Sequence, residues 1–282
     1  MVSGRAPAIG WSALTVAAVV AACGPLLLQL AFAGVAIGVI GMAHGASDLA
    51  IVAPRRRPLF LACYGLVCLI CLGWWIADPA VALPAFLLAS AIHFAMEDAP
   101  EGTWVERVAR GVSLIATPAT LHAASLTVIL QHGGITPAML PGLVTGLTWL
   151  GGIAAAGLLA LAIVRRDPRL FAGTAALLLL PPLIGFSLGF LILHALPQTW
   201  QRCERIGCMT AQSYLRAIAP VLGAAMLLVL LIGGIVWRWD DSGVRPLFAA
   251  IAALAMPHLL VTPWFEAGAA DPVTTPARSV PV

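Results

Sequence analysis

The chain has 282 residues, of which 61% are hydrophobic and only 10% are charged, and its net charge at pH 7 is +3. Soluble domains carry about 25% charged residues, so this composition excludes an ordinary soluble domain. The small net charge on so apolar a chain also excludes a nucleic-acid binder, which needs a concentrated basic patch. Since a membrane-spanning helix needs about 20 apolar residues, the length predicts an all-α bundle of about 8–10 transmembrane helices.

The predicted helices are the apolar stretches between clusters of Pro, Gly and Arg. In chain order they cover residues 6–24, 26–53, 58–77, 80–98, 104–131, 140–164, 169–182, 183–201, 207–236 and 245–266. Pro181-Pro182 marks either a tight turn between two spans or a kink in one long helix, which leaves nine or ten spans. We assign residues 1–266 to a single transmembrane domain and residues 267–282 to a flexible, polar C-terminal tail.

The basic residues, which are all Arg, indicate the orientation of the chain in the membrane. Cytoplasmic loops of membrane proteins accumulate positive charge. With ten spans, the loops on one side hold Arg55, Arg56, Arg57, Arg107, Arg110, Arg165, Arg166, Arg169, Arg202 and Arg205, and the other side holds Arg238 and Arg245. The charge pattern therefore favours ten spans in an inner (plasma) membrane, with both termini in the cytoplasm.

Four of the six histidines lie within apolar runs, where a buried polar side chain is costly unless it is paired. They are His44, His93, His194 and His258. In the predicted topology each lies about one to three turns before the cytoplasmic end of a helix, and at 1.5 Å per residue their depths differ by no more than about 10 Å. The sequence therefore permits the four side chains to converge on one point.

Neutral imidazoles gathered in this way suit a divalent transition metal such as iron, zinc or copper. One turn after three of the histidines comes a hydrogen-bonding side chain on the same helix face: Asp48, Glu97 and Gln198. Such groups orient metal-bound imidazoles through hydrogen bonds. Glu97 fits equally well as a helix-end side chain that reaches toward lipid headgroups. His122, in the middle of a helix, and His132, beside a loop, are left out of the predicted site.

These residues resemble the Brp/Blh family of membrane β-carotene 15,15′-dioxygenases in order and approximate spacing. The matching features are His44-Gly-Ala-Ser-Asp48, His93-Phe94 followed by Glu97-Asp98, the stretch from Arg110 to His122, His194, and Pro257-His258. The resemblance covers roughly residues 35 to 265, and it implies that His44, His93 and His194 are iron ligands.

The chain departs from the family pattern at two positions. Gln198 stands where the family typically has a second histidine, and Ala95 stands where the family commonly has glycine. The resemblance leaves three choices for a fourth partner of the iron: Gln198, a water molecule or His258.

The resemblance implies that Fe²⁺ and O₂ cleave the central double bond of β-carotene to two molecules of all-trans-retinal. β-Carotene dissolves in membrane lipid, so a membrane enzyme can take it up laterally, and a microbial rhodopsin is the natural acceptor of retinal. Aromatic residues near the histidines are candidates to line the substrate tunnel: Phe94, Phe186, Phe190, Trp200 and Trp264. The two tryptophans fit an interfacial belt equally well.

Three other functions could also place histidines within a polytopic membrane chain, and the sequence weighs against the third. A transporter or proton-relay protein would distribute His and Asp through the depth of the membrane as a path. A divergent oxygenase would act on another carotenoid. A membrane diiron oxygenase would need about eight histidines in repeated boxes, and the six histidines here form no such box.

Overall fold

The computed structural model describes residues 8–266, and within this part of the chain all regular structure is helical. The α-helices are α1 (Ala8–Ala22), α2 (Leu26–Val35), α3 (Met42–Gly45), α4 (Asp48–Ile51), α5 (Arg57–Ala77), α6 (Pro79–Glu97), α7 (Trp104–His132), α8 (Leu140–Arg165), α9 (Pro168–Leu179), α10 (Pro182–Phe190), α11 (Leu196–Arg205), α12 (Ala211–Trp237) and α13 (Val244–Glu266). A π-helix, Ala36–Gly41, joins α2 to α3, and a second one, Leu191–Ala195, joins α10 to α11. A short 3₁₀-helix, Pro54–Arg56, precedes α5.

Within residues 8–266, eight helical segments are long and apolar enough to cross a membrane. They are Leu26–Ile51, Pro54–Ala77, Pro79–Glu97, Trp104–His132, Leu140–Arg165, Pro182–Arg205, Ala211–Trp237 and Val244–Glu266. The expected all-α membrane bundle is therefore confirmed. The two remaining helices, α1 and α9, are apolar but have only 15 and 12 residues. At 1.5 Å per residue α9 is about 18 Å long, which is shorter than the bilayer core of about 30 Å.

The chain reverses direction between α9 and α10, so the double proline marks a tight turn and not a kink. Leu180 and Pro181 have extended backbone angles, and α9 and α10 then pack side by side in antiparallel directions. A Cβ atom at Gly189 would meet Leu177, and one at Gly173 would meet Leu193. The predicted tail at residues 267–282 lies outside the described residues.

Polar side chains at the N-termini of several helices explain where those helices begin. Asp78 accepts a hydrogen bond from the backbone of α6, Thr103 does so for α7, and Asp167 for α9. Thr210 and Ser213 form a reciprocal capping box at the start of α12. Each of these residues satisfies backbone N–H groups that the first turn of a helix leaves unpaired.

Glycines bring α6, α7 and α8 into close contact. A Cβ atom at Gly111 would lie 2.1 Å from the carbonyl oxygen of Ala91, and one at Gly151 would lie 2.3 Å from that of Ala116. Since lipid is as apolar as a leucine side chain, close packing of small residues is a main force that associates helices within a membrane.

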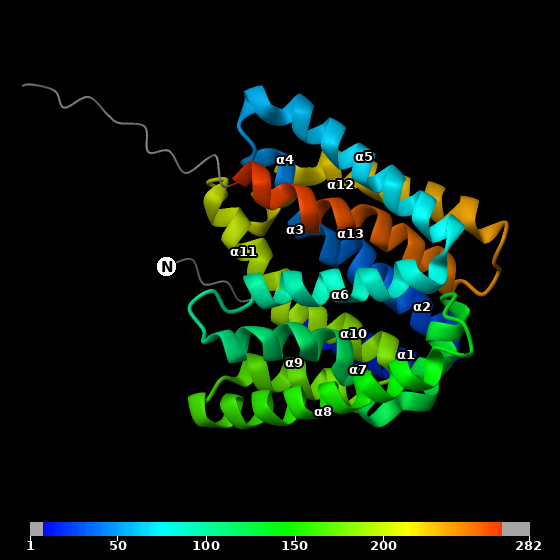
Figure 1. Cartoon of the computed structure of the whole chain (residues 1–282). Coiled ribbons are helices and arrows are strands. Elements are labelled where there is room, and N and C mark those ends of the chain that lie inside the picture. Colours follow the sequence, from blue (N-terminus) through cyan, green and yellow to red (C-terminus); the bar gives the residue numbers. More distant parts are fainter. Residues whose placement is uncertain (1–7, 267–282) are drawn as a thin grey trace, which may run out of the picture.

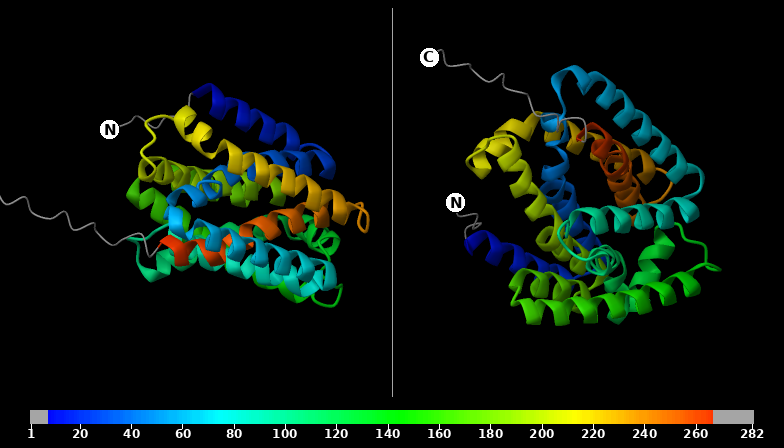
Figure 2. Two further views of the ribbon diagram at one scale, coloured as in Figure 1. Left: turned by 90° about the horizontal axis from the view of Figure 1, so that it is seen from above. Right: turned by 60° about the vertical axis from the view of Figure 1, so that its left-hand side comes forward.

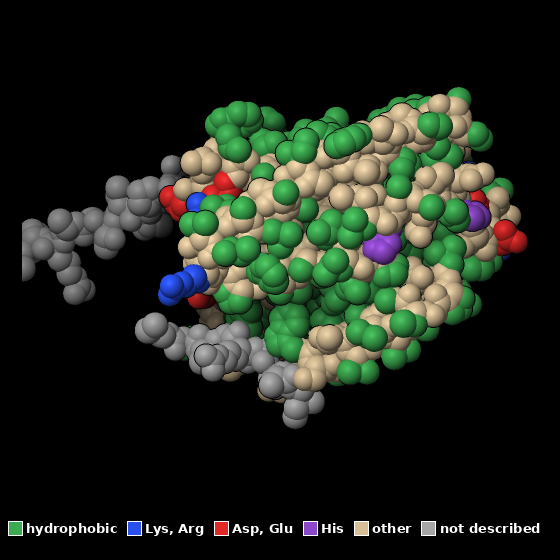
Figure 3. Space-filling model, turned by 90° about the horizontal axis from the view of Figure 1, so that it is seen from below, with side chains coloured by type: hydrophobic (Ala, Val, Ile, Leu, Met, Phe, Trp, Pro, Cys, Tyr) green, Lys and Arg blue, Asp and Glu red, His purple; other side chains and the backbone are tan. Residues whose placement is uncertain are grey.

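Charged side chains gather at the two ends of the bundle, which leaves an apolar belt between them (Figure 3). The arginine end is the left end in Figure 1, where α4, α11 and the end of α13 meet. Ion pairs and hydrogen bonds connect its helices through Arg56, Arg107, Arg165, Arg202 and Arg205, and Arg110 pairs with Glu106 within α7. Arg245 lies at the opposite end, beside Gly134 and paired with Asp240.

Candidate metal centre and apolar cavity

Four buried histidines from four segments of the chain form a closed ring near the arginine end. His44 lies on α3, His93 on α6, His194 on the second π-helix and His258 on α13. The ring centres of His44 and His93 each lie 5.1 or 5.2 Å from those of both His194 and His258. The structure thus brings together the four histidines that the sequence placed at similar depth.

Both π-helical turns lie next to this cluster. The turn Ala36–Gly41 ends just before His44, and the turn Leu191–Ala195 contains His194. A π-helical turn changes the helical register and alters the pairing of nearby backbone carbonyls. The carbonyl oxygen of Gly41 accepts a hydrogen bond from Nδ1 of His44. This bond fixes the orientation of the His44 ring and leaves its Nε2 without the proton.

Two aspartates hold the Nδ1 atoms of two further histidines. Nδ1 of His194 donates to Oδ1 of Asp98 at 2.6 Å, and Nδ1 of His258 donates to Oδ2 of Asp48 at 2.6 Å. An imidazole whose Nδ1 donates in this way offers its Nε2 lone pair as a ligand. The three hydrogen-bonded histidines are therefore held in the same tautomer.

The predicted pairing of Asp48 with His44 is wrong. Helical spacing predicted that Asp48 faces His44, but α3 ends at Gly45 and a turn at Ala46 and Ser47 separates the two residues. Asp48 contacts His258 instead, across 210 positions of the chain. Asp98 was not predicted as a partner of His194, because its only signal in the sequence is its position beside Glu97 after the His93-Phe94 pair.

Asp48 belongs to a buried network of ion pairs and hydrogen bonds. The Oδ2 atom of Asp48 also accepts a hydrogen bond from Thr262, and Arg202 lies 3.4 Å from Oδ1. Arg202 also pairs with Glu266 at 2.6 Å, and its side chain is only 4% exposed. The network links α4, α11 and α13, the helices around one side of the histidine ring.

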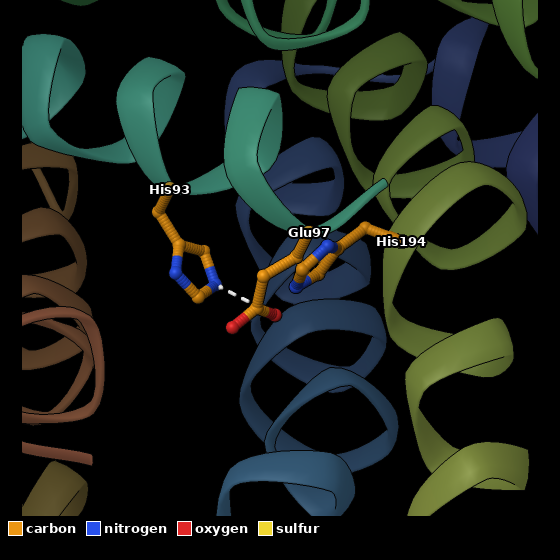
Figure 4. Close-up of side chains that lie close together, drawn as sticks. All are labelled: His93, Glu97 and His194. Atoms are coloured by element: carbon orange, nitrogen blue, oxygen red, sulfur yellow. Dashed lines mark ion pairs between the residues drawn. The ribbon is translucent and has the colours of Figure 1, made fainter. Parts of the chain in front are cut away.

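Glu97 points into the cluster (Figure 4). Its Oε2 atom lies 3.4 Å from Nε2 of His93, and neither atom has a hydrogen-bond partner among the described residues. One ligand atom from each of His93, Glu97 and His194 falls within 4.8 Å of the others. Glu97 therefore lies among the groups that could bind a metal directly, whereas the sequence predicted that it orients a metal-bound histidine through a hydrogen bond.

The geometry of the cluster fits a metal ion. Within the part of the chain that the structure describes, the buried Nε2 atoms of His93 and His258 both lack a hydrogen-bond partner, which is costly unless a ligand supplies one. A first-row metal binds imidazole nitrogen at about 2.0–2.1 Å, which leaves neighbouring ring centres about 5 Å apart, as here. Neutral imidazoles with one carboxylate suit iron among other transition metals.

The remaining polar residues of the prediction lie at the edge of the cluster or away from it. Gln198 is buried on α11, one turn beyond His194. His122 is half-buried at a break in the helical backbone of α7 and donates to the carbonyl oxygen of Leu179. His132 donates to the carbonyl oxygen of Val128.

The histidine ring opens onto a cavity of about 390 Å³. Its polar lining consists of the four histidines with Asp48, Tyr64 and Ser90. Three of the aromatic residues that the sequence offered as candidates for the tunnel line this cavity: Phe94, Phe186 and Phe190. The ring centres of Phe94 and Phe190 lie 4.7 and 5.4 Å from that of His194. All other lining residues are apolar or glycine.

The structure does not bring the two predicted tryptophans to this cavity. Neither Trp200 nor Trp264 is among its lining residues, and Trp264 is 77% exposed. Both follow a histidine by six positions, which on a helix with about 100° per residue turns a side chain away from that histidine. An exposed tryptophan close to the charged end of a span is typical of a membrane interface.

Comparison with known proteins identifies the family. The family model of beta-carotene 15,15'-dioxygenase matches residues 35–266, which is most of the chain. The chain belongs to this family. No curated protein and no solved structure gives a significant match. The matched region of this dioxygenase family member includes all four clustered histidines and the whole lining of the cavity, whereas α1 lies before it.

Proposed function

We propose that the chain is an iron-dependent dioxygenase that cleaves the central 15,15′ double bond of β-carotene with O₂ to form two molecules of all-trans-retinal. The observation that carries this proposal is the ring of four buried histidines that opens onto an apolar cavity inside a membrane bundle. A polyene has no polar group to pair, so a cavity with few polar side chains suits it. Membership of the family supports the choice of β-carotene.

His44, His93, His194 and His258 would hold the iron, and Glu97 lies where its carboxylate can complete the site. Bound Fe²⁺ would supply the redox chemistry that lets O₂ react with a carbon–carbon double bond. Both oxygen atoms end in the two aldehyde products, so the reaction needs no proton donor. Asp48, Asp98 and the Gly41 carbonyl keep the protons of three histidines on Nδ1, away from the metal.

The cavity determines what reaches the iron. Phe94 and Phe190 lie beside His194 and form the wall against which a flat conjugated chain would lie. The mostly apolar lining would limit the access of water to the reacting bond.

Expression in cells that accumulate β-carotene tests the proposal. We expect the cells to lose their colour and to yield retinal on chromatography, and the purified protein to contain one iron per chain. Intact β-carotene beside protein that is folded in the membrane would refute the function. The metal content separates the alternatives, because a transporter needs no iron and a diiron oxygenase needs two per chain.

We also propose that the arginine end faces the cytoplasm and that the membrane is the inner membrane, which leaves retinal available to a microbial rhodopsin there. The support is the concentration of arginines at that end and the positive-inside rule. A fluorescent protein fused to the C-terminus should fluoresce, because it folds in the cytoplasm; a periplasmic reporter that is active at the same position would contradict this orientation.

A further inference from the structure

We propose that a lateral opening between α5 and α12 is the route by which the polyene passes between the lipid and the histidine ring. This inference rests on the proposed function and adds to it a location and an entry path. Of the described side chains that line the cavity, only Leu61 on α5 and Ala224 on α12 are exposed. Leu61 is 53% exposed, within an apolar segment that is long enough to span the membrane. The cavity therefore reaches the surface where lipid surrounds the protein.

The two helices lie on the same side of the molecule, with α13 beneath them (Figures 1 and 2). Each packs on α13. Ala255, His258 and Leu259 of α13 all line the cavity, at positions that share one helix face. A chain that enters between α5 and α12 would therefore pass along this face of α13 and meet the histidine ring at His258.

The structure of α12 suits it to form one side of an opening. It is the least buried of the eight spans. Its first turns are anchored, because the Tyr214 hydroxyl donates to the carbonyl oxygen of Ala43 and Ile218 is buried. Pro220 then removes one backbone hydrogen bond, one turn before Ala224. The part of α12 beside the opening can therefore bend away from α5 while its beginning stays attached.

The cavity also extends away from the opening, deeper into the bundle. Along α6 the lining residues run from His93 back to Leu83, a distance of about 15 Å at 1.5 Å per residue. Leu130 and Leu183, both buried, line this deep part. A substrate whose central bond lies at the histidine ring needs room on both sides. One half would occupy the deep part, and the other half would extend through the opening toward lipid.

Reversible blocking of the opening tests this proposal. Leu61→Cys and Ala224→Cys proteins in lipid vesicles would each be modified with a bulky aromatic methanethiosulfonate, assayed for retinal formation from β-carotene, and assayed again after reduction. Matched controls are Leu66→Cys and Leu227→Cys, which lie on the same helices, are 59% and 69% exposed, and do not line the cavity. The wild-type chain, which has no introduced cysteine but whose native Cys23 is exposed, is treated with the same reagent as a control.

We expect modification at position 61 or 224 to lower kcat/KM by at least about tenfold, mainly through KM, and reduction to restore it. Modification at 66 or 227 should change it less than twofold. Equal activity of all four modified proteins would overturn the proposal. Recovery on reduction shows that a loss reflects blocking and not unfolding.

A second measurement does not depend on turnover. Without O₂, β-carotene in the vesicles should slow the modification of Ala224→Cys at least about threefold relative to Leu227→Cys. If the wild-type protein forms no retinal, the proposed function fails, but this protection would still support a polyene-binding opening. If the wild-type protein forms retinal and there is neither protection nor blocking, the function stands and the lateral route is refuted.

Discussion

Replacement of Asp48 should weaken iron binding although Asp48 lies on the far side of His258 from the cluster. Its carboxylate accepts hydrogen bonds from Nδ1 of His258 at 2.6 Å and from Thr262 at 2.7 Å, and it pairs with Arg202. Removal of this acceptor frees the His258 ring to rotate and to adopt the other tautomer. The ligand atom would then be lost for part of the time.

The size of the effect follows from the strength of the bonds. Hydrogen bonds to a charged group contribute about 1.5–3 kcal/mol and are roughly twice as strong as neutral ones. Asp48→Asn keeps one acceptor without its charge, so it should cost about 1 kcal/mol, or about fivefold in iron affinity. Asp48→Ala leaves His258, Thr262 and Arg202 without their acceptor and should cost about 100-fold, the upper end for groups that orient metal ligands.

Anaerobic titration with Fe²⁺ against a competing chelator measures both affinities. Asp240→Asn provides the control, because Asp240 also pairs with an arginine, Arg245, but at the opposite end of the bundle. It should bind iron as the wild type does. Wild-type iron affinity in folded Asp48→Ala would refute the reasoning, since it would mean that His258 is not a ligand or needs no orienting partner.

Three further outcomes are expected. His258→Ala should lose bound iron whereas His122→Ala should keep it, as metal analysis of the purified proteins would show; equal iron content would remove His258 from the site. Gly111→Leu should lower the free energy of unfolding by about 3 kcal/mol, because its side chain would overlap α6, whereas Gly146→Leu, which faces open space, should have little effect in the same thermal unfolding measurement. Gln198→His should leave the iron content at one per chain, because His258 already completes the ring of four; two irons per chain would contradict this arrangement.

The helices could be predicted well because their ends carry strong signals. Arginine clusters, prolines and capping residues such as Asp78 and Asp167 separate apolar runs that are too hydrophobic for loops. The interior of residues 26–53 could not be predicted in this way. Its π-helical turn and the break after Gly45 depend on contacts with other helices, and no residue pattern in the segment predicts them.

The members of the histidine ring could be predicted, but most of their partners could not. Depth along a helix follows from counting residues to the charged end, and this placed His44 and His258 at similar levels. Which side chains meet depends on the rotation of each helix about its axis, which tertiary packing sets. Phe190, four residues before His194, shares its face and lines the cavity, whereas Trp200, six residues after it, does not.

The placement of buried charge also connects the fold to the proposed chemistry. An ion buried in a protein costs several kcal/mol even when it is paired, and helix packing in a membrane does not require one. Yet Asp48, Asp98, Glu97 and Arg202 are all largely buried, and each either contacts a clustered histidine or holds a residue that does. Their cost is understandable if they keep the imidazoles oriented toward a metal. Apolar replacements of this network would then make the bundle no less stable while they remove its iron, which distinguishes a network kept for chemistry from one kept for folding.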